Sequence, residues 1–125
     1  AYSEDEIVAR NYILKDKPDV VINVVDATNL ERNLYLTTQL IEMGANVVIA
    51  LNMIDQAEAL NIEIDTNKLS KRLGVPIIKT SALKNRGIEE LIETSIHSKK
   101  NEKLININYG EDIENKKPFF FTRNI

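Results

Sequence analysis

The chain has 125 residues, 43% of them hydrophobic, which is enough for one ordinary domain with a core of its own. Its net charge of -3 is spread along the chain with both signs mixed, so no nucleic-acid partner is expected, and the lack of cysteine excludes disulfides and thiolate metal sites and fits an intracellular location. The longest apolar stretches are only a few residues, far below the roughly 20 that a membrane-spanning helix needs.

The first part of the chain predicts two helices with one strand between them. A capping-box pattern that begins at Ser3 predicts a helix reaching about Lys15. Val20 to Val25 is β-branched and nearly all apolar, which is typical of a strand covered on both faces in a parallel sheet. Leu30 to Met43 carries a helical apolar stripe, and Gly44 is placed to end that helix.

The middle of the chain repeats this alternation. Asn46 to Leu51 predicts a second strand, followed by a helical stretch that is interrupted from Asn61 to Asp65 and closed by Gly74. Pro76 begins a third strand, and Gly87 opens the last clear helix. Such alternation predicts a right-handed, doubly wound α/β fold with a parallel sheet of about three strands.

The final part of the chain carries weaker signals. Ser98 to Lys103 is interpreted as a polar linker, and Tyr109 to Glu114 as the start of another helix. Asn115 to Ile125 has no periodicity, and Pro118 would interrupt any helix, so an irregular tail is expected. Phe119 to Phe121 is either a docking patch for the domain's own surface or the remnant of a truncated reading frame, and we favour the remnant.

Two motifs follow predicted strands and indicate a pocket for guanine. Asn52-Met53-Ile54-Asp55 comes directly after the run Val47 to Leu51, and Thr80-Ser81-Ala82-Leu83 comes after Val75 to Ile78. Ligands of α/β proteins bind at the carboxyl ends of parallel strands, where a carboxylate can accept both the ring N–H and the exocyclic amine of guanine. The candidate base-binding residues are Asn52, Met53, Asp55, Ser81, Ala82 and Leu83.

Each polar group in this pocket has an expected role. Asp55 would read guanine N1 and N2, and Asn52 would tie the two loops together and meet the base edge. The N–H of Ala82 would point at the guanine carbonyl, where adenine carries a donor instead. The alternative is that Asn52 or Asp55 merely caps a helix, but the second motif favours the pocket. Asp26 is interpreted as ordering a turn, and we assign no catalytic residue and no metal site.

The chain contains no G-x-x-x-x-G-K-[ST] phosphate loop. A pocket that grips only the base should bind weakly, because the phosphate loop and its metal ion ordinarily supply much of the nucleotide affinity and most of the transition-state stabilisation. We therefore do not expect the chain alone to hydrolyse GTP.

The motifs resemble those of the ferrous iron transport protein B (FeoB) family. The resemblance rests on the run Val25 to Leu36, on Leu51 to Asp55 and on Thr80 to Ala82, and it extends over about residues 1–114. Most GTPases have Lys at the second position of the Asn-x-x-Asp motif, whereas Met53 is FeoB-like. Met53 lacks the aliphatic chain and the charge with which that Lys would lie along the base, so nucleotide affinity is expected to be modest.

The resemblance implies a partial P-loop GTPase-type, three-layer fold. Residues 1–98 would be the C-terminal part of the GTP-binding domain, and residues 99–125 a linker, the start of a helical domain and an irregular tail. The phosphate loop and the Mg²⁺ ligands would lie upstream of this chain, and a helical domain and a membrane permease downstream. The chain would thus belong to the cytoplasmic domain of a cell-membrane transporter, with GTP or GDP contacted only at the base.

Two other functions remain open from the sequence. Without upstream strands, Val20 to Val25 would have an unpaired edge, and this edge or the patch Phe119 to Phe121 would suit a stand-alone α/β interaction module. The chain would otherwise be a fragment of an Era-type GTPase, although Met53 disfavours that family.

Overall fold

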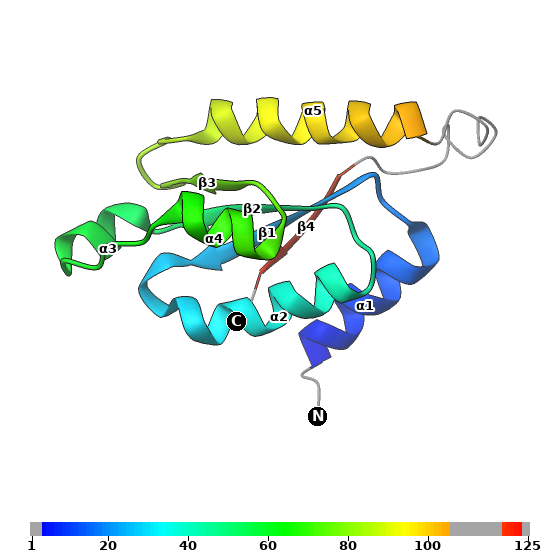
Figure 1. The fold of residues 1–125 in the computed structure, drawn as a ribbon. Coiled ribbons are helices and arrows are strands. Elements are labelled where there is room, and N and C mark those ends of the chain that lie inside the picture. The colour runs from blue at the N-terminus through cyan, green and yellow to red at the C-terminus, as the bar shows by residue number, and fades with distance from the viewer. Residues whose placement is uncertain (1–3, 106–118, 124–125) are drawn as a thin grey trace.

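The computed structural model describes residues 4–105 and 119–123, which form a parallel sheet with helices on both faces (Figure 1). The strand order is β3-β2-β1-β4. The predicted α/β class, with a parallel sheet flanked by helices, is confirmed. In chain order the elements are α1 (Glu4–Asp16), β1 (Val20–Asp26), the 3₁₀ turn η1 (Ala27–Asn29), α2 (Leu30–Glu42), β2 (Val47–Asn52), α3 (Ile54–Ala59), α4 (Thr66–Leu73), β3 (Ile77–Lys79), α5 (Ile88–Ile105) and β4 (Phe119–Arg123).

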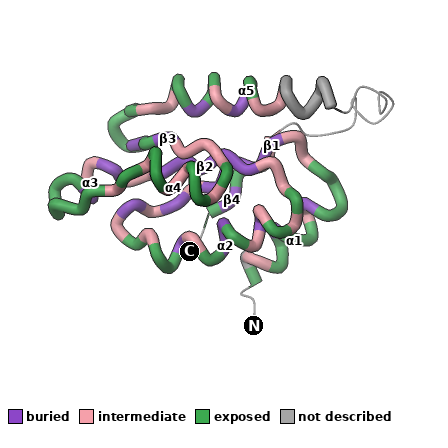
Figure 2. Tube along the Cα trace, viewed as in Figure 1, coloured by how far each residue is buried: buried purple, intermediate pink, exposed green. Residues whose placement is uncertain are grey.

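The larger of two apolar clusters lies between the sheet and helices α1, α2 and α3. Alternate residues of β1, such as Val21 and Val25, point to this face and are fully buried. They pack with side chains of α2, including Leu40, which is 1% exposed. Figure 2 shows the buried positions along the central strands. The apolar stripe predicted for the helix that begins at Leu30 is therefore the face that packs on the sheet.

The opposite face of the sheet is covered by α5. The intervening residues of the same strands, including Val20, Ile22 and Val48, form a second cluster with Leu91 of α5. Because β1 and β2 bury side chains on both faces, their sequences are nearly all apolar, apart from Asn23 of β1 and the polar residue that ends each strand, instead of alternating. These two strands are the buried centre of the sheet.

The carboxyl ends of the strands meet at one edge of the sheet. In the parallel ladder Asp26 of β1 lies opposite Asn52 of β2, and Leu51 lies opposite Lys79 of β3. Asp26 Oδ1 accepts hydrogen bonds from Thr28 N (2.8 Å) and Thr28 Oγ1 (2.6 Å). The predicted role of Asp26 in ordering its turn is confirmed, and the side chain is committed to that turn.

The expectation of an irregular tail is wrong for Phe119–Arg123, which forms β4. This strand pairs in parallel with β1, with Val20 opposite Phe119 and Val24 opposite Arg123. The Phe120 ring stacks on Tyr12 of α1, with ring centroids 4.2 Å apart. The expected unpaired edge on Val20 to Val25 is wrong for the same reason. The sequence of β4 does not alternate between apolar and polar residues, and periodicity alone cannot identify a short apolar run as a strand.

The linker expected from Ser98 to Lys103 is also wrong, because α5 continues through it to Ile105. Lys and Glu favour helix, and no Gly or Pro interrupts this stretch, so a polar composition was not a stop signal. The helix start expected at Tyr109 to Glu114, and Ser3 of the capping box, lie outside the described residues. Within residues 4–105 and 119–123, no helix has the length and apolar character needed to cross a membrane.

Candidate functional site

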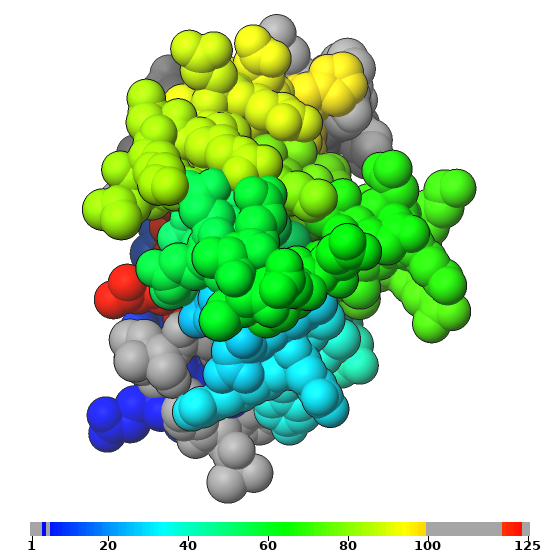
Figure 3. Space-filling view, turned by 90° about the vertical axis from the view of Figure 1, so that its left-hand side faces the viewer, coloured from blue at the N-terminus to red at the C-terminus, as the bar shows by residue number. Residues whose placement is uncertain are grey.

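The two predicted motifs lie together at the carboxyl edge of the sheet. A cavity of about 290 Å³ is lined by residues from the start of α3 and from the loop between β3 and α5. Figure 3 shows the end of the molecule where these segments lie side by side. Small-molecule sites usually occupy about 300–1,000 Å³, so this cavity is at the lower end of the range. Its volume therefore suits a base more than a whole nucleotide. All six residues predicted from the sequence line this cavity, namely Asn52, Met53, Asp55, Ser81, Ala82 and Leu83.

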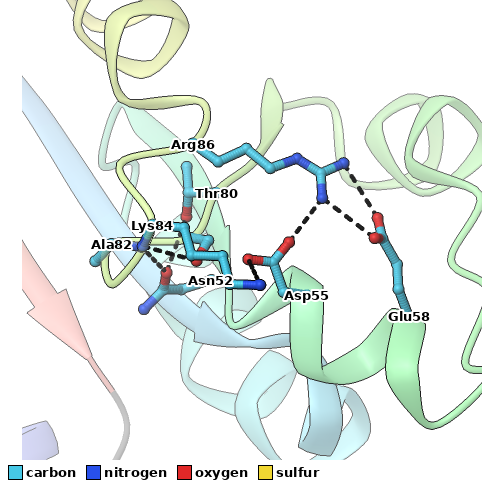
Figure 4. A network of polar contacts seen from close by, with 8 residues as sticks. Asn52, Asp55, Glu58, Thr80, Ala82, Lys84 and Arg86 are labelled. Atoms are coloured by element: carbon cyan, nitrogen blue, oxygen red, sulfur yellow. Dashed lines mark hydrogen bonds and ion pairs between the residues drawn. The ribbon is translucent and has the colours of Figure 1, made fainter.

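Asn52 links the two loops through its side-chain oxygen. Oδ1 accepts hydrogen bonds from Ala82 N (3.1 Å) and from Thr80 Oγ1 (3.3 Å), as Figure 4 shows. The predicted tie between the loops is confirmed. The Ala82 N–H, however, is engaged by Asn52 instead of standing free toward the cavity, because the amide oxygen lies within hydrogen-bond distance. The Asn52 side chain is thus a structural member of both loops.

The backbone turns sharply between Asn52 and α3. Met53 has left-handed geometry (φ 61°, ψ 30°) and precedes the helix without a side-chain cap. Its carbonyl accepts from Gln56 N and Ala57 N, both at 3.1 Å. The alternative in which Asn52 or Asp55 caps the helix is therefore wrong. Asp55 does not cap the helix and instead lines the cavity, with its side chain 21% exposed.

The loop after β3 is closed by its own backbone. Ser81 and Arg86 form an antiparallel bridge, each N–H donating to the other's carbonyl at 2.9 Å. Gly87 follows with φ 75°, and a Cβ at this position would collide with the carbonyl oxygen of Lys79, so no other residue fits without displacing the strand. Leu83, at the tip, is 91% exposed. The bridge fixes the base of the loop and leaves the tip accessible.

Asp55 is surrounded by two cations from this loop. Its Oδ1 lies 2.8 Å from Arg86 Nη1, and its Oδ2 lies 3.7 Å from Lys84 Nζ. Arg86 also contacts Glu58, with Nη2 3.1 Å from Oε1 (Figure 4). The side chain of Ser81, and next Arg86, hold the pKa of Asp55 below its ordinary value. Asp55 is therefore an anion at neutral pH and an acceptor for N–H groups in the cavity.

Sequence reasoning missed Glu58, Lys84 and Arg86. Opposite charges in loops that follow neighbouring strands are a usable signal, because those loops meet at one edge of a parallel sheet. The individual pairings depend on side-chain direction within a loop, which the sequence does not show.

The Mg²⁺ implied by the family resemblance does not fit the described residues. Within residues 4–105 and 119–123, no three histidine or carboxylate side chains are grouped as metal ligands. Asp26, at the end of the strand next to β2, accepts hydrogen bonds from Thr28 through Oδ1 within its own turn.

Comparison with known sequences gives one family. The sequence model of the family described as "Ferrous iron transport protein B" matches residues 1–95. The "Fe(2+) transporter FeoB" of Escherichia coli (strain K12) is 47% identical over 114 residues, which are 91% of this chain and 15% of the relative. The same transporter of Salmonella typhimurium is 53% identical over 89 residues, which are 71% of this chain and 12% of the relative.

Solved structures agree in sequence and in fold. The FeoB G-domain of Methanococcus jannaschii superposes with a TM-score of 0.76 at 58% identity, covering 80% of this chain and 64% of that one. NFeoB of S. thermophilus with bound mGMPPNP gives a TM-score of 0.73 at 54% identity, covering 79% of this chain and 38% of that one. The chain spans 15% or less of the length of the curated relatives described above. Because the family match covers well over half of its residues, the chain belongs to the ferrous iron transport protein B family.

Proposed function

We propose that the chain is part of the GTP-binding domain of a ferrous iron transporter and that the cavity beside Asp55 recognises guanine. The observation that carries the proposal is an anionic carboxylate on the wall of a base-sized cavity, with both expected motifs around it. The related S. thermophilus structures are described with bound GDP and GMPPNP, which supports a guanine nucleotide as the ligand here.

The chemistry of the cavity favours guanine over adenine. Asp55 would accept the N1–H and the 2-amino group of guanine, two parallel donors that adenine does not present at that edge. Asn52 Oδ1 already accepts two hydrogen bonds, so its amide nitrogen is the group that would donate to the base. The Ala82 N–H would be shared between Asn52 and the guanine carbonyl. Met53 and Leu83 would supply the apolar walls.

The rest of the transporter would complete the site. The C-terminal part of the nucleotide domain, expected over residues 1–98, is proposed to extend to the end of α5, with the phosphate loop and the Mg²⁺ ligands on another segment of the longer protein. Since α5 reaches Ile105, the boundary to any helical domain would lie beyond that residue. The domain would work on the cytoplasmic side of the membrane beside a permease, and hydrolysis would require the completed site.

Titration of GDP, XDP and ADP into the 125-residue chain tests the assignment of the base. Wild type should bind GDP weakly and in preference to ADP. Asp55→Asn should reverse the preference toward XDP, because an amide donates to the 2-carbonyl of xanthine where a carboxylate repels it. Glu63→Gln, which neutralises an exposed carboxylate that does not line the cavity, is the matched control and should behave as wild type.

A longer chain, joined to a phosphate-loop segment from a relative, separates weak binding from absent binding. If only the joined chain binds and it prefers GDP, the cavity is the base-recognising part of a divided site. If neither chain separates guanine from adenine, the proposal is abandoned and the interaction-module alternative returns.

A further inference from the structure

Arg86 contacts Asp55 from outside the cavity. Lys84 and Asp55 line the cavity, whereas Arg86 is not among the lining residues, although its Nη1 lies 2.8 Å from Asp55 Oδ1. The two cations beside Asp55 therefore occupy different positions. Lys84 is 69% exposed and 3.7 Å from Oδ2, so an incoming base can displace it at little cost. Arg86 holds the other oxygen from the far side.

A second carboxylate keeps the Arg86 guanidinium in place. Glu58 lies one turn after Asp55 on α3 and accepts from both terminal nitrogens of Arg86, with Nη2–Oε1 at 3.1 Å and Nη1–Oε2 at 3.2 Å. At the other end, the backbone of Arg86 is bridged to Ser81. The planar guanidinium of Arg86 thus links the closed loop to Asp55 and Glu58 of α3, and we call this set of contacts the Arg86 brace. It fixes the direction of one Asp55 oxygen (Figure 4).

Reading guanine with two hydrogen bonds demands a fixed carboxylate. Both Asp55 oxygens must lie in the plane of the base edge, and a carboxylate without an anchor rotates broadly about its terminal torsion. Each carboxylate oxygen has about two acceptor positions, so Oδ1 can accept from Arg86 and still accept from a base. Oδ2 is shielded from water and makes no hydrogen bond in good geometry with the described residues, although Lys84 Nζ lies 3.7 Å away and the Ser81 side chain helps to lower the pKa of Asp55. A base that displaces Lys84 would therefore find an acceptor there.

We propose that Arg86 is the positioning residue for Asp55 and that this brace sets the discrimination between guanine and purines without a 2-amino group. The inference rests on the proposed function, because it assigns a role within the same cavity. Loss of the brace would leave the carboxylate able to make one bond to N1–H but not the second to the amine. Discrimination would then fall while the pocket itself persists.

Three variants separate positioning from charge and from folding. Arg86→Gln removes the charge and the fork. Arg86→Lys keeps the charge but has no planar pair of donors to join Asp55 and Glu58. Arg72→Gln is the matched control, because Arg72 is an exposed arginine in the last turn of α4, outside the cavity lining. Urea unfolding of all three establishes that each remains folded at the assay temperature.

The first measurement compares the affinities of GMP and IMP for the 125-residue chain. IMP differs only by lacking the 2-amino group, so the ratio of the two affinities reports the second hydrogen bond. Arg86→Gln and Arg86→Lys should each lower the GMP affinity by about tenfold and the IMP affinity much less, as expected for loss of one good hydrogen bond. Arg72→Gln should leave the ratio unchanged.

The second measurement needs no nucleotide. A ¹³C carboxyl titration follows Asp55, whose neighbours are the Ser81 side chain and the charged groups of Lys84, Arg86 and, through Arg86, Glu58. In Arg86→Gln the pKa of Asp55 should rise part of the way toward the ordinary value, because Ser81, the largest cause of the lowered pKa, remains. Acid loss of GMP binding should then begin at a higher pH. In Arg86→Lys the pKa should stay lowered, although the affinity ratio falls.

The outcomes keep the two proposals apart. If wild type prefers GMP to IMP and Arg86→Gln retains that ratio, the brace has no positioning role and the inference is overturned, while guanine recognition stands. If wild type shows no preference between the two, Asp55 does not read the amine, and the proposed function fails together with the inference. A folded Arg86→Gln variant with a collapsed ratio and a raised Asp55 pKa supports both.

Discussion

The Asn52 side chain should contribute measurably to stability, because it is the polar link between the end of β2 and the loop after β3. Asn52→Ala removes the acceptor of two hydrogen bonds, from Ala82 N and Thr80 Oγ1. A net hydrogen bond contributes about 0.5–1.5 kcal/mol, and Ala82 is exposed enough for water to replace its lost partner. Thr80 is only 2% exposed, so its hydroxyl bears most of the loss. The expected destabilisation is about 1–2 kcal/mol.

Urea unfolding at 25 °C, followed by circular dichroism, measures this loss as a lower midpoint with an unchanged slope. Asn52→Asp is the matched control, because it keeps the acceptor oxygen and nearly the same shape. It should retain most of the stability, since a carboxylate accepts from an N–H at least as well as an amide does. The reasoning is refuted if Asn52→Ala unfolds within about 0.3 kcal/mol of wild type, or if Asn52→Asp loses as much as Asn52→Ala.

Three further predictions concern the core, the loop and the response to acid. Thr37→Val should lower the free energy of unfolding in urea by about 1–3 kcal/mol, because it leaves the buried Asn23 amide oxygen without its donor. Thr37→Ser keeps the hydroxyl and should lose less, so equal losses would contradict this assignment. Gly87→Ala should cost at least about 1–2 kcal/mol from its positive φ alone, and more from collision with the Lys79 carbonyl, so an unchanged midpoint would contradict the assigned geometry. The pKa of Asp55 is lowered on folding, so its contribution to stability is complete above the ordinary pKa of 3.8 and is lost as the pH falls through the folded value. The stability difference between wild type and Asp55→Asn should therefore shrink only below about pH 5, and a difference that is independent of pH would show that the carboxylate gains nothing on folding.

Much of this fold can be read from hydrophobic pattern, because β1 and β2 are buried on both faces. Their largely apolar runs, ending at Asp26 and Asn52, predicted both strands to within a residue or two. The positive φ of Gly74 likewise made the end of α4 predictable. These features are local, since each depends on residues near it in sequence.

Features that depend on distant partners were predicted poorly. β4 is a strand because β1 offers an open edge and Tyr12 offers a ring to Phe120, and neither fact lies within the C-terminal sequence. In the site, the motifs placed Asp55 correctly, but the pairing of Arg86 with Asp55 and Glu58 depends on how the loop between β3 and α5 folds back. The Ala82 N–H was expected to face the base, but it donates to the Asn52 oxygen, through which the predicted tie between the two loops is made.

The pairing of β4 with β1 has a consequence for the order in which the sheet is completed during synthesis. Phe119 leaves the ribosome 99 residues (119 − 20) after its partner Val20. At about 5–20 residues per second, the outer edge of β1 waits on the order of 5–20 s before β4 exists. Throughout that interval β4 cannot yet pair with the backbone donors and acceptors on this edge of a strand that is apolar except for Asn23 and Asp26. The pairing of β4 with β1 is therefore a late step in the assembly of this sheet, because it waits for the synthesis of residues 119–123.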